Sequence, residues 1–365
     1  MKRILQIMGK MDRAGAETML MNLYRHIDRS KVQFDFVTFT YDKGDYDDEI
    51  IAMGGKIIPI VAKDSISRMF KLQKFLKSHP EYQIIHSHVL LNNAFHLIAA
   101  KSAGIKHRIS HSHNTSNGAD SKLKKLYEIW AKKTIQKLAT YRIACGVEAA
   151  QYLYSTADDV LILNNAIDLK KYADIAKAQK NYWDNVLPHK GFKLIQVGRL
   201  TEVKNHEFSL KVAKALRKQG FEFTFFIVGQ GGLESKIRDL IIEYELSEQV
   251  HLLGVRDDVP ELMAGADLML MPSLHEGFPV VLVESQAIGL PSLISINISR
   301  EVDLRIDLIE YENLNKMHNW LNKIKGFNLS LKPQVGYIDL LAKQGFDIKK
   351  NSEKLLNLYI NMESK

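Results

Sequence analysis

Residues 265–291 read GADLMLMPSLHEGFPVVLVESQAIGLP, and they contain the clearest structural pattern in the chain. An apolar run of strand length ends at Pro272, a polar loop follows, and a second apolar segment begins at Pro279, a residue type favoured at helix starts. Gly289, with a proline two positions later, ends that helix. The stretch therefore predicts a buried strand, a loop and a helix in succession, which is the repeating unit of an α/β fold with a parallel sheet.

Two acidic residues lie on either side of the predicted helix start, Glu276 in the loop and Glu284 within the helix. The start of a helix offers unpaired amide groups and the positive end of the helix dipole, which suit a diphosphate. Carboxylates beside it can accept hydrogen bonds from the hydroxyl groups of a sugar or a ribose. The stretch therefore also predicts a site for a ligand that carries phosphate and hydroxyl groups.

The same alternation of short apolar runs and longer segments with helical periodicity extends over most of the chain. It predicts an α/β fold of two Rossmann-like, doubly wound domains facing a cleft, 1–168 and 169–344, with a terminal helix in 345–365 expected to pack back on the first domain. The segment 169–190 has no strand pattern and is the expected connection between the domains. After about residue 296 the pattern weakens. The predicted strands are Arg3–Met8, Val32–Phe39, Lys56–Ile60, Ile84–Ser87, Arg108–His111, Arg142–Ala144, Val160–Leu163, Lys193–Val197, Phe223–Val228, His251–Leu253, Leu268–Met271 and Ser292–Ile294.

A length of 365 residues is too great for one compact core, and a composition of 46% hydrophobic and 25% charged residues is typical of globular proteins. The single cysteine, Cys145, excludes an intramolecular disulfide and suits a reducing compartment. The apolar start of the chain is interrupted by Gln6 and ends at Lys10, unlike a signal peptide. No window of about 18 apolar residues is present to span a membrane. We therefore expect a cytoplasmic protein.

The net charge of +8 is concentrated in part of the chain. Residues 121–142 contain one acid, Glu128, among seven basic residues, with apolar residues interleaved at near-helical spacing. One interpretation is a basic amphipathic helix on an anionic lipid surface, at the inner face of the plasma membrane. The other is a surface helix whose apolar stripe faces its own core. The basic residues are Lys122, Lys124, Lys125, Lys132, Lys133, Lys137 and Arg142.

A second polar loop follows a predicted strand, in the sequence VGRLTEVKN of residues 197–205. It places two cations, Arg199 and Lys204, beside a glycine turn. Taken alone, such loop cations are as often solvated surface charges as ligands. Whether Arg199 and Lys204 bind a ligand must therefore be judged together with the motif in residues 265–291.

That motif carries a family resemblance. The sequence PSLHEGFP at 272–279, with Glu276 and Glu284 spaced as in an E-x7-E motif, resembles the retaining family 4 glycosyltransferases, whose fold is called GT-B. The resemblance covers residues 1–296 and is densest from 193 to 291. It implies that Glu276 contacts the transferred sugar near the reacting carbon and that Glu284 contacts the nucleotide ribose. The same donor site would include Gly277, Phe278, Pro279 and Val280.

In that family an arginine and a lysine at the positions of Arg199 and Lys204 neutralise the donor diphosphate, and their charge would stabilise the leaving nucleotide. The resemblance therefore implies a metal-independent enzyme without a cofactor, whose co-substrate is a nucleotide sugar such as a UDP-sugar. The run VGQGG at 228–232 resembles the family's next glycine turn.

The first half of the chain adds a glycine and a histidine to the expected site. The loop that ends at Gly15 resembles the family's glycine-rich first loop, in which this residue would let the backbone approach the donor phosphate. Two HSH sequences, at 86–88 and 111–113, end predicted strands. His113 falls where the family places a histidine near the sugar, which implies that it holds a sugar hydroxyl. We interpret the other histidines as polar residues at a cleft and expect no metal site, because neither clustered cysteines nor a helical HExxH motif accompanies them.

The resemblance implies transfer of a sugar, with retained anomeric configuration, from a nucleotide-diphosphate donor to a glycan or lipid-linked acceptor in capsule, exopolysaccharide or lipopolysaccharide assembly. The nearest alternative enzyme is a nucleotide-sugar 2-epimerase of similar fold. A nucleic-acid-binding protein is suggested only by the basic charge, and no aromatic platform supports it, so we expect no nucleic acid partner. A non-catalytic sugar-binding module is disfavoured because the expected acidic and basic site residues are all present.

Overall fold

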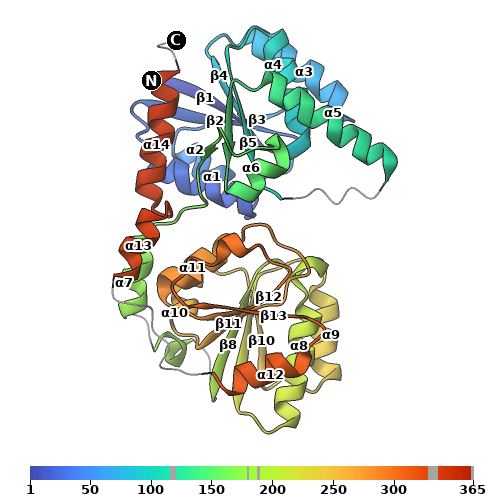
Figure 1. Ribbon diagram of the computed structural model, residues 1–365, viewed down its shortest axis with the longest axis vertical. Helices are drawn as coiled ribbons and strands as arrows, with labels where there is room; N and C mark the ends of the chain where they lie inside the picture. The colour runs from blue at the N-terminus through green and yellow to red at the C-terminus, as the bar shows by residue number, and fades with distance from the viewer. Residues whose placement is uncertain (116–120, 179–180, 187–189, 328–335, 363–365) are drawn as a thin grey trace. The chain divides into compact units, whose positions relative to one another are not determined.

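The computed structural model describes residues 1–115, 121–178, 181–186, 190–327 and 336–362. The chain divides into two compact units. The first consists of Met1–Ala166 with Gly345–Lys365, and the second is Ile167–Gln344 (Figure 1). This division falls close to the sequence-predicted boundary after residue 168. Parts of the expected connection (179–180 and 187–189) and the end of the terminal segment (363–365) lie outside the described residues.

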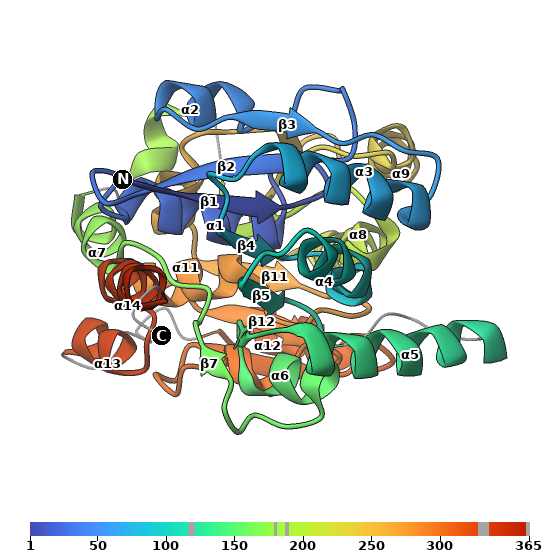
Figure 2. The same ribbon diagram turned by 90° about the horizontal axis from the view of Figure 1, so that it is seen from above.

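The first unit is built on a seven-stranded parallel sheet with the order β3-β2-β1-β4-β5-β6-β7. Figure 2 shows the first five strands of this order side by side. The chain adds strands on one side of β1 and then crosses back to add the later ones on the other side. Ligands of such sheets bind at the carboxyl ends of the strands near this switch. The strands are β1 (Lys2–Ile7), β2 (Val32–Thr38), β3 (Ile57–Pro59), β4 (Ile84–Ser87), β5 (His107–Ser112), β6 (Tyr141–Ala144) and β7 (Leu161–Ile162).

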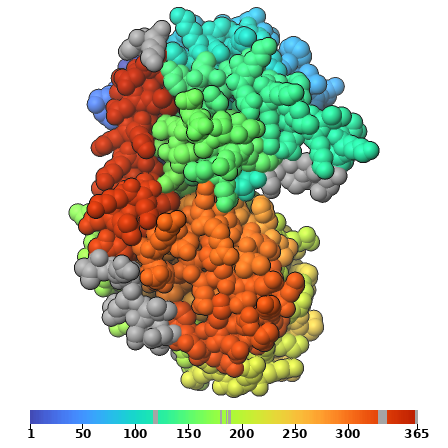
Figure 3. Space-filling view, viewed as in Figure 1, coloured from blue at the N-terminus to red at the C-terminus, as the bar shows by residue number. Residues whose placement is uncertain are grey.

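Helices cover both faces of this sheet, because successive strand residues point to opposite faces. Ile4 packs into the core formed with α1 and α14, whereas its neighbour Leu5 packs into the core formed with α3, α4, α5 and α6. The C-terminal α14 contacts α1 and buries Leu355 and Tyr359, so it completes the first unit; it is red in Figure 3. The helices are α1 (Gly15–His26), α2 (Asp47–Ala52), α3 (Ser65–Ser78), α4 (Asn93–Ser102), α5 (Lys122–Leu138), α6 (Val147–Tyr154) and α14 (Ile348–Asn361), with a 3-10 turn at Leu90–Asn92.

The second unit repeats the arrangement with a six-stranded parallel sheet in the order β10-β9-β8-β11-β12-β13. Helices α8, α9 and α12 pack on one face, and α7, α10 and α11 pack on the other. The strands are β8 (Phe192–Val197), β9 (Phe223–Val228), β10 (Val250–Gly254), β11 (Leu268–Met271), β12 (Ser292–Ser295) and β13 (Ile309–Glu312). The helices are α7 (Leu169–Ala178), α8 (His206–Lys218), α9 (Glu234–Glu243), α10 (Val259–Ala264), α11 (Val280–Ile288), α12 (Met317–Lys325) and α13 (Tyr337–Lys343), with 3-10 turns at Tyr182–Asn185, Glu202–Lys204 and Arg300–Val302.

The predicted fold class of two Rossmann-like α/β domains is confirmed, and every predicted strand overlaps an observed one. The prediction of a connecting segment at 169–190 is wrong for its described residues. They form α7 and a 3-10 turn whose Trp183 is buried, stacks on Phe226 at 3.6 Å and donates to the carbonyl of Leu262. The weakening pattern after residue 296 also concealed β13 and α12.

Candidate active site

Two loops of the second unit are joined at the carboxyl ends of β8 and β11, which are neighbouring strands. The amide of Leu274 donates to the carbonyl of Val203 at 2.8 Å. Asn205 Nδ2 donates to the carbonyl of Pro272 at 3.0 Å, from a left-handed backbone conformation that asparagine tolerates. The structure therefore brings together the two motifs that are far apart in the sequence. Sequence reasoning missed the role of Asn205, although it stands next to Lys204.

Lys204 and Glu276 meet where these loops join. Nζ of Lys204 lies 2.6 Å from Oε1 of Glu276, and the side chains are 19% and 17% exposed. The two groups form an ion pair, but the angles at this contact are not those of a hydrogen bond. Glu276 is also fixed through its backbone, which bridges to Ile298 and accepts a hydrogen bond from the amide of Ser299 at 3.3 Å. Arg199 extends from the same loop as Lys204, and its exposed side chain has no ion-pair partner among the described residues.

The helix that follows Glu276 offers amide donors close to this pair. α11 begins at Val280 with Pro279 as its N-cap, so the prediction of Pro279 as the first helical residue is wrong by one position. Gly277 and Phe278 complete the loop between Glu276 and the helix. Within the described residues no side chain caps the first turn of α11, so its amides can donate to an anion.

Glu284 lies one turn into α11 and is held by a residue that the sequence did not single out. Tyr172 of α7 donates to Oε1 of Glu284 at 2.8 Å. Burial raises the pKa of Glu284, and the hydrogen bond from Tyr172 and the charge of Lys171 partly oppose this. The spacing of Leu169, Tyr172 and Ala176 fits one face of a helix and is the signal that could have predicted α7.

The glycine turn of VGQGG packs directly on the Arg199 loop. A Cβ added to Gly229, whose φ is +138°, would lie 2.1 Å from the carbonyl oxygen of Gly198. The amide of Leu200 donates to the carbonyl of Gln230 at 3.0 Å. Glycine is therefore required here for the close approach of two turns.

Gly15 and His113 both belong to the first unit. Gly15 is the first residue of α1, and an added Cβ would meet nothing within 4 Å, so packing among the described residues does not require a glycine. His113 directly follows β5, and burial lowers the pKa of its side chain to about 3. His113 is therefore a neutral imidazole at the carboxyl end of the sheet.

The structure also brings the histidines of the two HSH sequences together. Candidate ligand atoms of His86, His88 and His111 lie within 4.8 Å of one another. However, both ring nitrogens of His86 and His88 and Nδ1 of His111 are engaged in hydrogen bonds. In this structure these nitrogens are therefore members of a hydrogen-bonded network.

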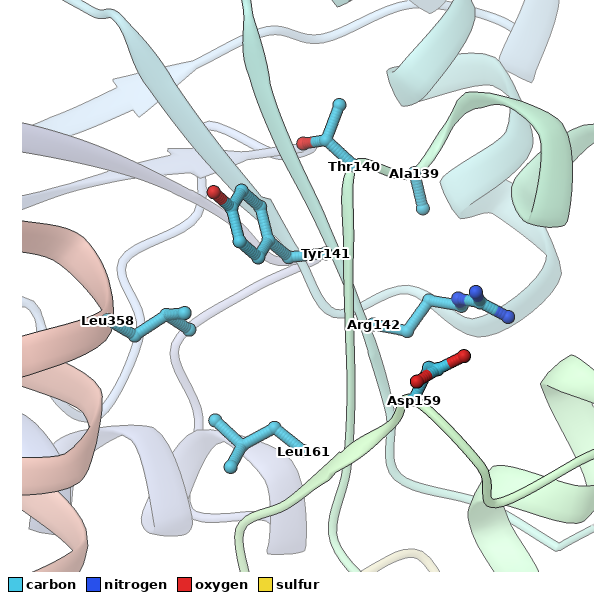
Figure 4. Close-up of a pocket in the computed structure, with 7 residues that line it drawn as sticks. All are labelled: Ala139, Thr140, Tyr141, Arg142, Asp159, Leu161 and Leu358. Carbon is cyan, nitrogen blue, oxygen red and sulfur yellow. The ribbon is translucent and has the colours of Figure 1, made fainter. Parts of the chain in front are cut away.

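A hollow of about 370 Å³ lies at the other end of the first sheet (Figure 4). It is lined by Tyr141 and Arg142 of β6, Leu161 of β7 and Leu358 of α14. These residues lie toward the amino ends of β6 and β7, whereas His113 follows the carboxyl end of β5. The hollow is therefore not part of the candidate site.

Comparison with known proteins places the chain in a family. Residues 13–171 match the family described as Glycosyltransferase Family 4, and residues 177–302 match the family described as Glycosyl transferases group 1. A protein of Bacillus subtilis (strain 168) named "Putative glycosyltransferase EpsF" is 35% identical over 373 residues, which cover 98% of this chain and 96% of that protein. This chain belongs to the group 1 and family 4 glycosyltransferases.

Two further comparisons describe relatives of this family. The UDP-Gal:alpha-D-GlcNAc-diphosphoundecaprenol alpha-1,3-galactosyltransferase of Escherichia coli is 28% identical over 359 residues, covering 90% of each protein. The crystal structure of Anabaena HepE in complex with UDP-glucose has a TM-score of 0.77 at 16% identity, covering 99% of this chain and 100% of that one. The similarity to HepE shows the fold of this chain, which is that of GT-B glycosyltransferases. The alternative of a nucleotide-sugar 2-epimerase gains no support from these comparisons.

Proposed function

We propose that this glycosyltransferase moves a sugar, with retained anomeric configuration, from a nucleotide-diphosphate donor to a glycan or lipid-linked acceptor in cell-surface polysaccharide synthesis. The observation that carries the proposal is the junction of the two loops in the second unit. At this junction Lys204 pairs with Glu276, and α11 begins a few residues after Glu276 in the sequence. The names of the relatives support the setting, since the Escherichia coli enzyme acts on a diphosphoundecaprenol-linked sugar and CapH of Staphylococcus aureus is named for capsular polysaccharide biosynthesis.

The roles follow from charge and hydrogen-bonding capacity. Arg199, Lys204 and the amides that open α11 would bind the diphosphate and stabilise the negative charge that develops as the glycosidic bond breaks. This arrangement would supply the charge compensation without a metal ion. Glu276 would accept hydrogen bonds from hydroxyls of the transferred sugar, and Glu284 from those of the ribose. In the first unit, Gly15 would allow close approach to the donor phosphate, and His113 would contact the sugar.

The acceptor side of the proposal includes an anionic membrane surface, bound through α5. The amino-terminal half of this helix exposes apolar side chains three or four positions apart, whereas Ala131, Ile135 and Leu138 in its later half are buried in the core. The exposed apolar residues are Leu123, Leu126, Ile129 and Trp130, and exposed lysines flank them. An apolar stripe with a basic surround matches the chemistry of an anionic bilayer surface. Among the described residues no helix is long and apolar enough to span the bilayer. We propose a cytoplasmic enzyme that associates peripherally with the membrane.

The test uses a panel of UDP- and GDP-sugars with lipid-linked acceptors, followed by determination of the anomeric configuration of the product. We expect transfer with retention, a near-complete loss in Glu276→Ala, and normal folding of that variant. Glu310→Gln is a matched control, because Glu310 is a glutamate paired with a lysine in the same unit and lies outside the site. An epimerised donor formed without acceptor, or transfer with inversion, would refute the proposal.

A further inference from the structure

Polar side chains replace apolar ones toward the carboxyl ends of three strands in the first unit. On the face covered by α14, Ile4 of β1 is followed two residues later by Gln6, and Ile84 of β4 is followed by His86. Ile109 of β5 is followed in the same way by His111. Two residues beyond His86 and His111 stand two further histidines, His88 and His113. The hydroxyl of Tyr359 in α14 also contacts this group. The members are His113, His88, Gln6, Tyr359, His86 and His111, and all except His113, which is half-buried, are buried.

These six side chains form one continuous chain of hydrogen bonds. On one side of Gln6, Oε1 contacts Nε2 of His88 at 2.9 Å, and Nδ1 of His88 contacts Nε2 of His113 at 2.9 Å. On the other side, Nε2 of Gln6 donates to Oη of Tyr359 at 3.1 Å. The tyrosine Oη lies 2.7 Å from Nδ1 of His86, whose Nε2 lies 3.2 Å from Nδ1 of His111.

Each contact fixes the tautomer of the next ring, because a neutral imidazole has one donor and one acceptor nitrogen. With the Gln6 amide as the structure orients it, Oε1 must accept from Nε2 of His88, so Nδ1 of His88 carries no proton. That nitrogen must then accept from Nε2 of His113. Nδ1 of His113 is left without a proton, and it is buried with no hydrogen-bond partner among the described residues.

The other half of the chain runs in the same direction. Tyr359 receives a hydrogen bond from Gln6, so its own proton goes to Nδ1 of His86. His86 then donates from Nε2 to Nδ1 of His111. Nε2 of His111 carries the last proton and has no partner among the described residues. The direction is therefore shared by all members, and turning the Gln6 amide would reverse it throughout.

We infer that Gln6 and Tyr359 are positioning residues for His113: they couple its tautomer to the orientation of the Gln6 amide, and the orientation present here sets Nε2–H and leaves Nδ1 as a hydrogen-bond acceptor for a sugar hydroxyl. This inference rests on the proposed role of His113 at the sugar. It makes the C-terminal helix part of the site machinery, although Tyr359 contacts Gln6 and His86 and not His113 itself. Burial lowers the pKa of His86, His88 and His111 well below the usual value, which keeps the rings neutral as the tautomer logic requires.

The test compares Tyr359→Phe with Tyr24→Phe. Both tyrosines are fully buried in the same core, and both contact Phe34, but the hydroxyl of Tyr24 contacts the carbonyl of Met53 outside the relay. Nitrogen NMR of protein labelled in histidine reports the tautomer of each ring. We expect His113 to be Nε2–H in the wild type, and to become mixed in Tyr359→Phe, because the Gln6 amide is then free to turn. Tyr24→Phe should leave the tautomer unchanged.

Transfer assays supply the second measurement. Tyr359→Phe should lower kcat/KM for the donor about threefold or more beyond Tyr24→Phe, which corresponds to the loss of one oriented hydrogen bond. Gln6→Met provides an independent variant with the same expected direction. An Nδ1–H tautomer in the wild type, an unchanged tautomer in Tyr359→Phe, or stoichiometric Zn²⁺ binding by the histidines would overturn the inference. Absence of transferase activity in the wild type would instead refute the proposed function, and the tautomer measurement would still decide the hydrogen-bond chain.

Discussion

Nζ of Lys204 lies 2.6 Å from Oε1 of Glu276, although the proposed chemistry assigns these residues to different parts of the donor. The lysine would bind the diphosphate, and the glutamate would bind the sugar. Because both side chains are mostly buried, neither can exchange its partner for water without cost. Donor binding would therefore have to replace this ion pair with contacts to the ligand.

Glu276→Gln should consequently separate binding from transfer. The substitution removes the carboxylate that competes for Lys204, so UDP should bind up to about fivefold more tightly, in line with ion pairs worth up to about 1 kcal/mol. Sugar transfer should fall by at least about a hundredfold, because the sugar loses its charged acceptor. Calorimetric titration with UDP and steady-state kinetics measure the two effects. Glu310→Gln should change neither, and weaker UDP binding in Glu276→Gln would contradict the competition.

Tyr172→Phe should shift the pH dependence of donor binding. Burial raises the pKa of Glu284, and the hydrogen bond from Tyr172 lowers it, so removing that hydroxyl should raise the pKa further. Glu284 would then become protonated at a higher pH and lose its ability to accept from both ribose hydroxyls. As the pH is lowered from 8 to 5, the donor KM of Tyr172→Phe should therefore begin to rise at a higher pH than the donor KM of the wild type.

Tyr337→Phe is the matched control for this measurement. Tyr337 also donates from its hydroxyl to α11, to the carbonyl of Ala287 at 2.8 Å, but it does not contact Glu284. Its KM profile should follow that of the wild type. Coincident profiles for all three proteins would show that Tyr172 does not govern the ionisation of Glu284.

The loops that follow strands could be predicted from the sequence, whereas the side chains that hold them could not. The apolar run before Pro272 and the glycine turn before Arg199 are local signals, and local signals fix strand ends. Tyr172 lies 112 residues from Glu284, and Tyr359 lies 353 residues from Gln6. Such contacts depend on how distant elements pack, which periodicity within one segment does not report.

The histidines are a second example of contacts that the sequence alone could not predict. Both HSH sequences lie at strand ends, as predicted, and the change from Ile84 to His86 was visible in the sequence. That the rings of two strands stack and share protons follows only from the register of β4 with β5 and from the position of α14. Similarly, helical spacing in 121–142 left two interpretations open, because it could not predict that Leu123 and Leu126 are exposed whereas Leu138 is buried in the core.

Membrane binding through α5 predicts a difference between two adjacent lysines. Lys133 is exposed, whereas Lys132 pairs with Glu128 at 2.7 Å and lies 3.8 Å from the ring centre of Tyr152. Each lysine near an anionic surface contributes about 1 kcal/mol, so Lys133→Gln should weaken binding to phosphatidylserine vesicles about fivefold. Lys132→Gln should have a smaller effect, because its charge is already compensated.

Cosedimentation at increasing salt measures this binding, and the affinity should fall as the charges are screened. Trp130→Ser should weaken it further, since its side chain is 41% exposed on the apolar stripe. Binding that is insensitive to salt and to all three substitutions would exclude α5 as the contact surface.

The buried histidines of the first unit predict a loss of stability in mild acid. Burial lowers the pKa of His96 and of His113 to about 3, and lowers those of His86, His88 and His111 well below the usual value of about 6.5. Below about pH 6.5 the unfolded chain therefore binds more protons than the folded one, so the free energy of unfolding falls as the pH falls. Each histidine that stays neutral contributes up to about 1.4 kcal/mol per pH unit to this slope.

Thermal unfolding of the first unit between pH 7.5 and 5 measures this slope. The Tm should fall steadily below about pH 6.5 and should be nearly constant above it. His96→Gln should reduce the slope, because it removes one buried neutral imidazole whose Nδ1 contacts Oγ of Ser87 at 2.8 Å. The exposed His318 lies in the second unit, and His318→Gln should leave the slope unchanged. A Tm that does not vary over this range would mean that these histidines bind protons in the folded chain as readily as in the unfolded one, and the neutral hydrogen-bond chain would then be untenable.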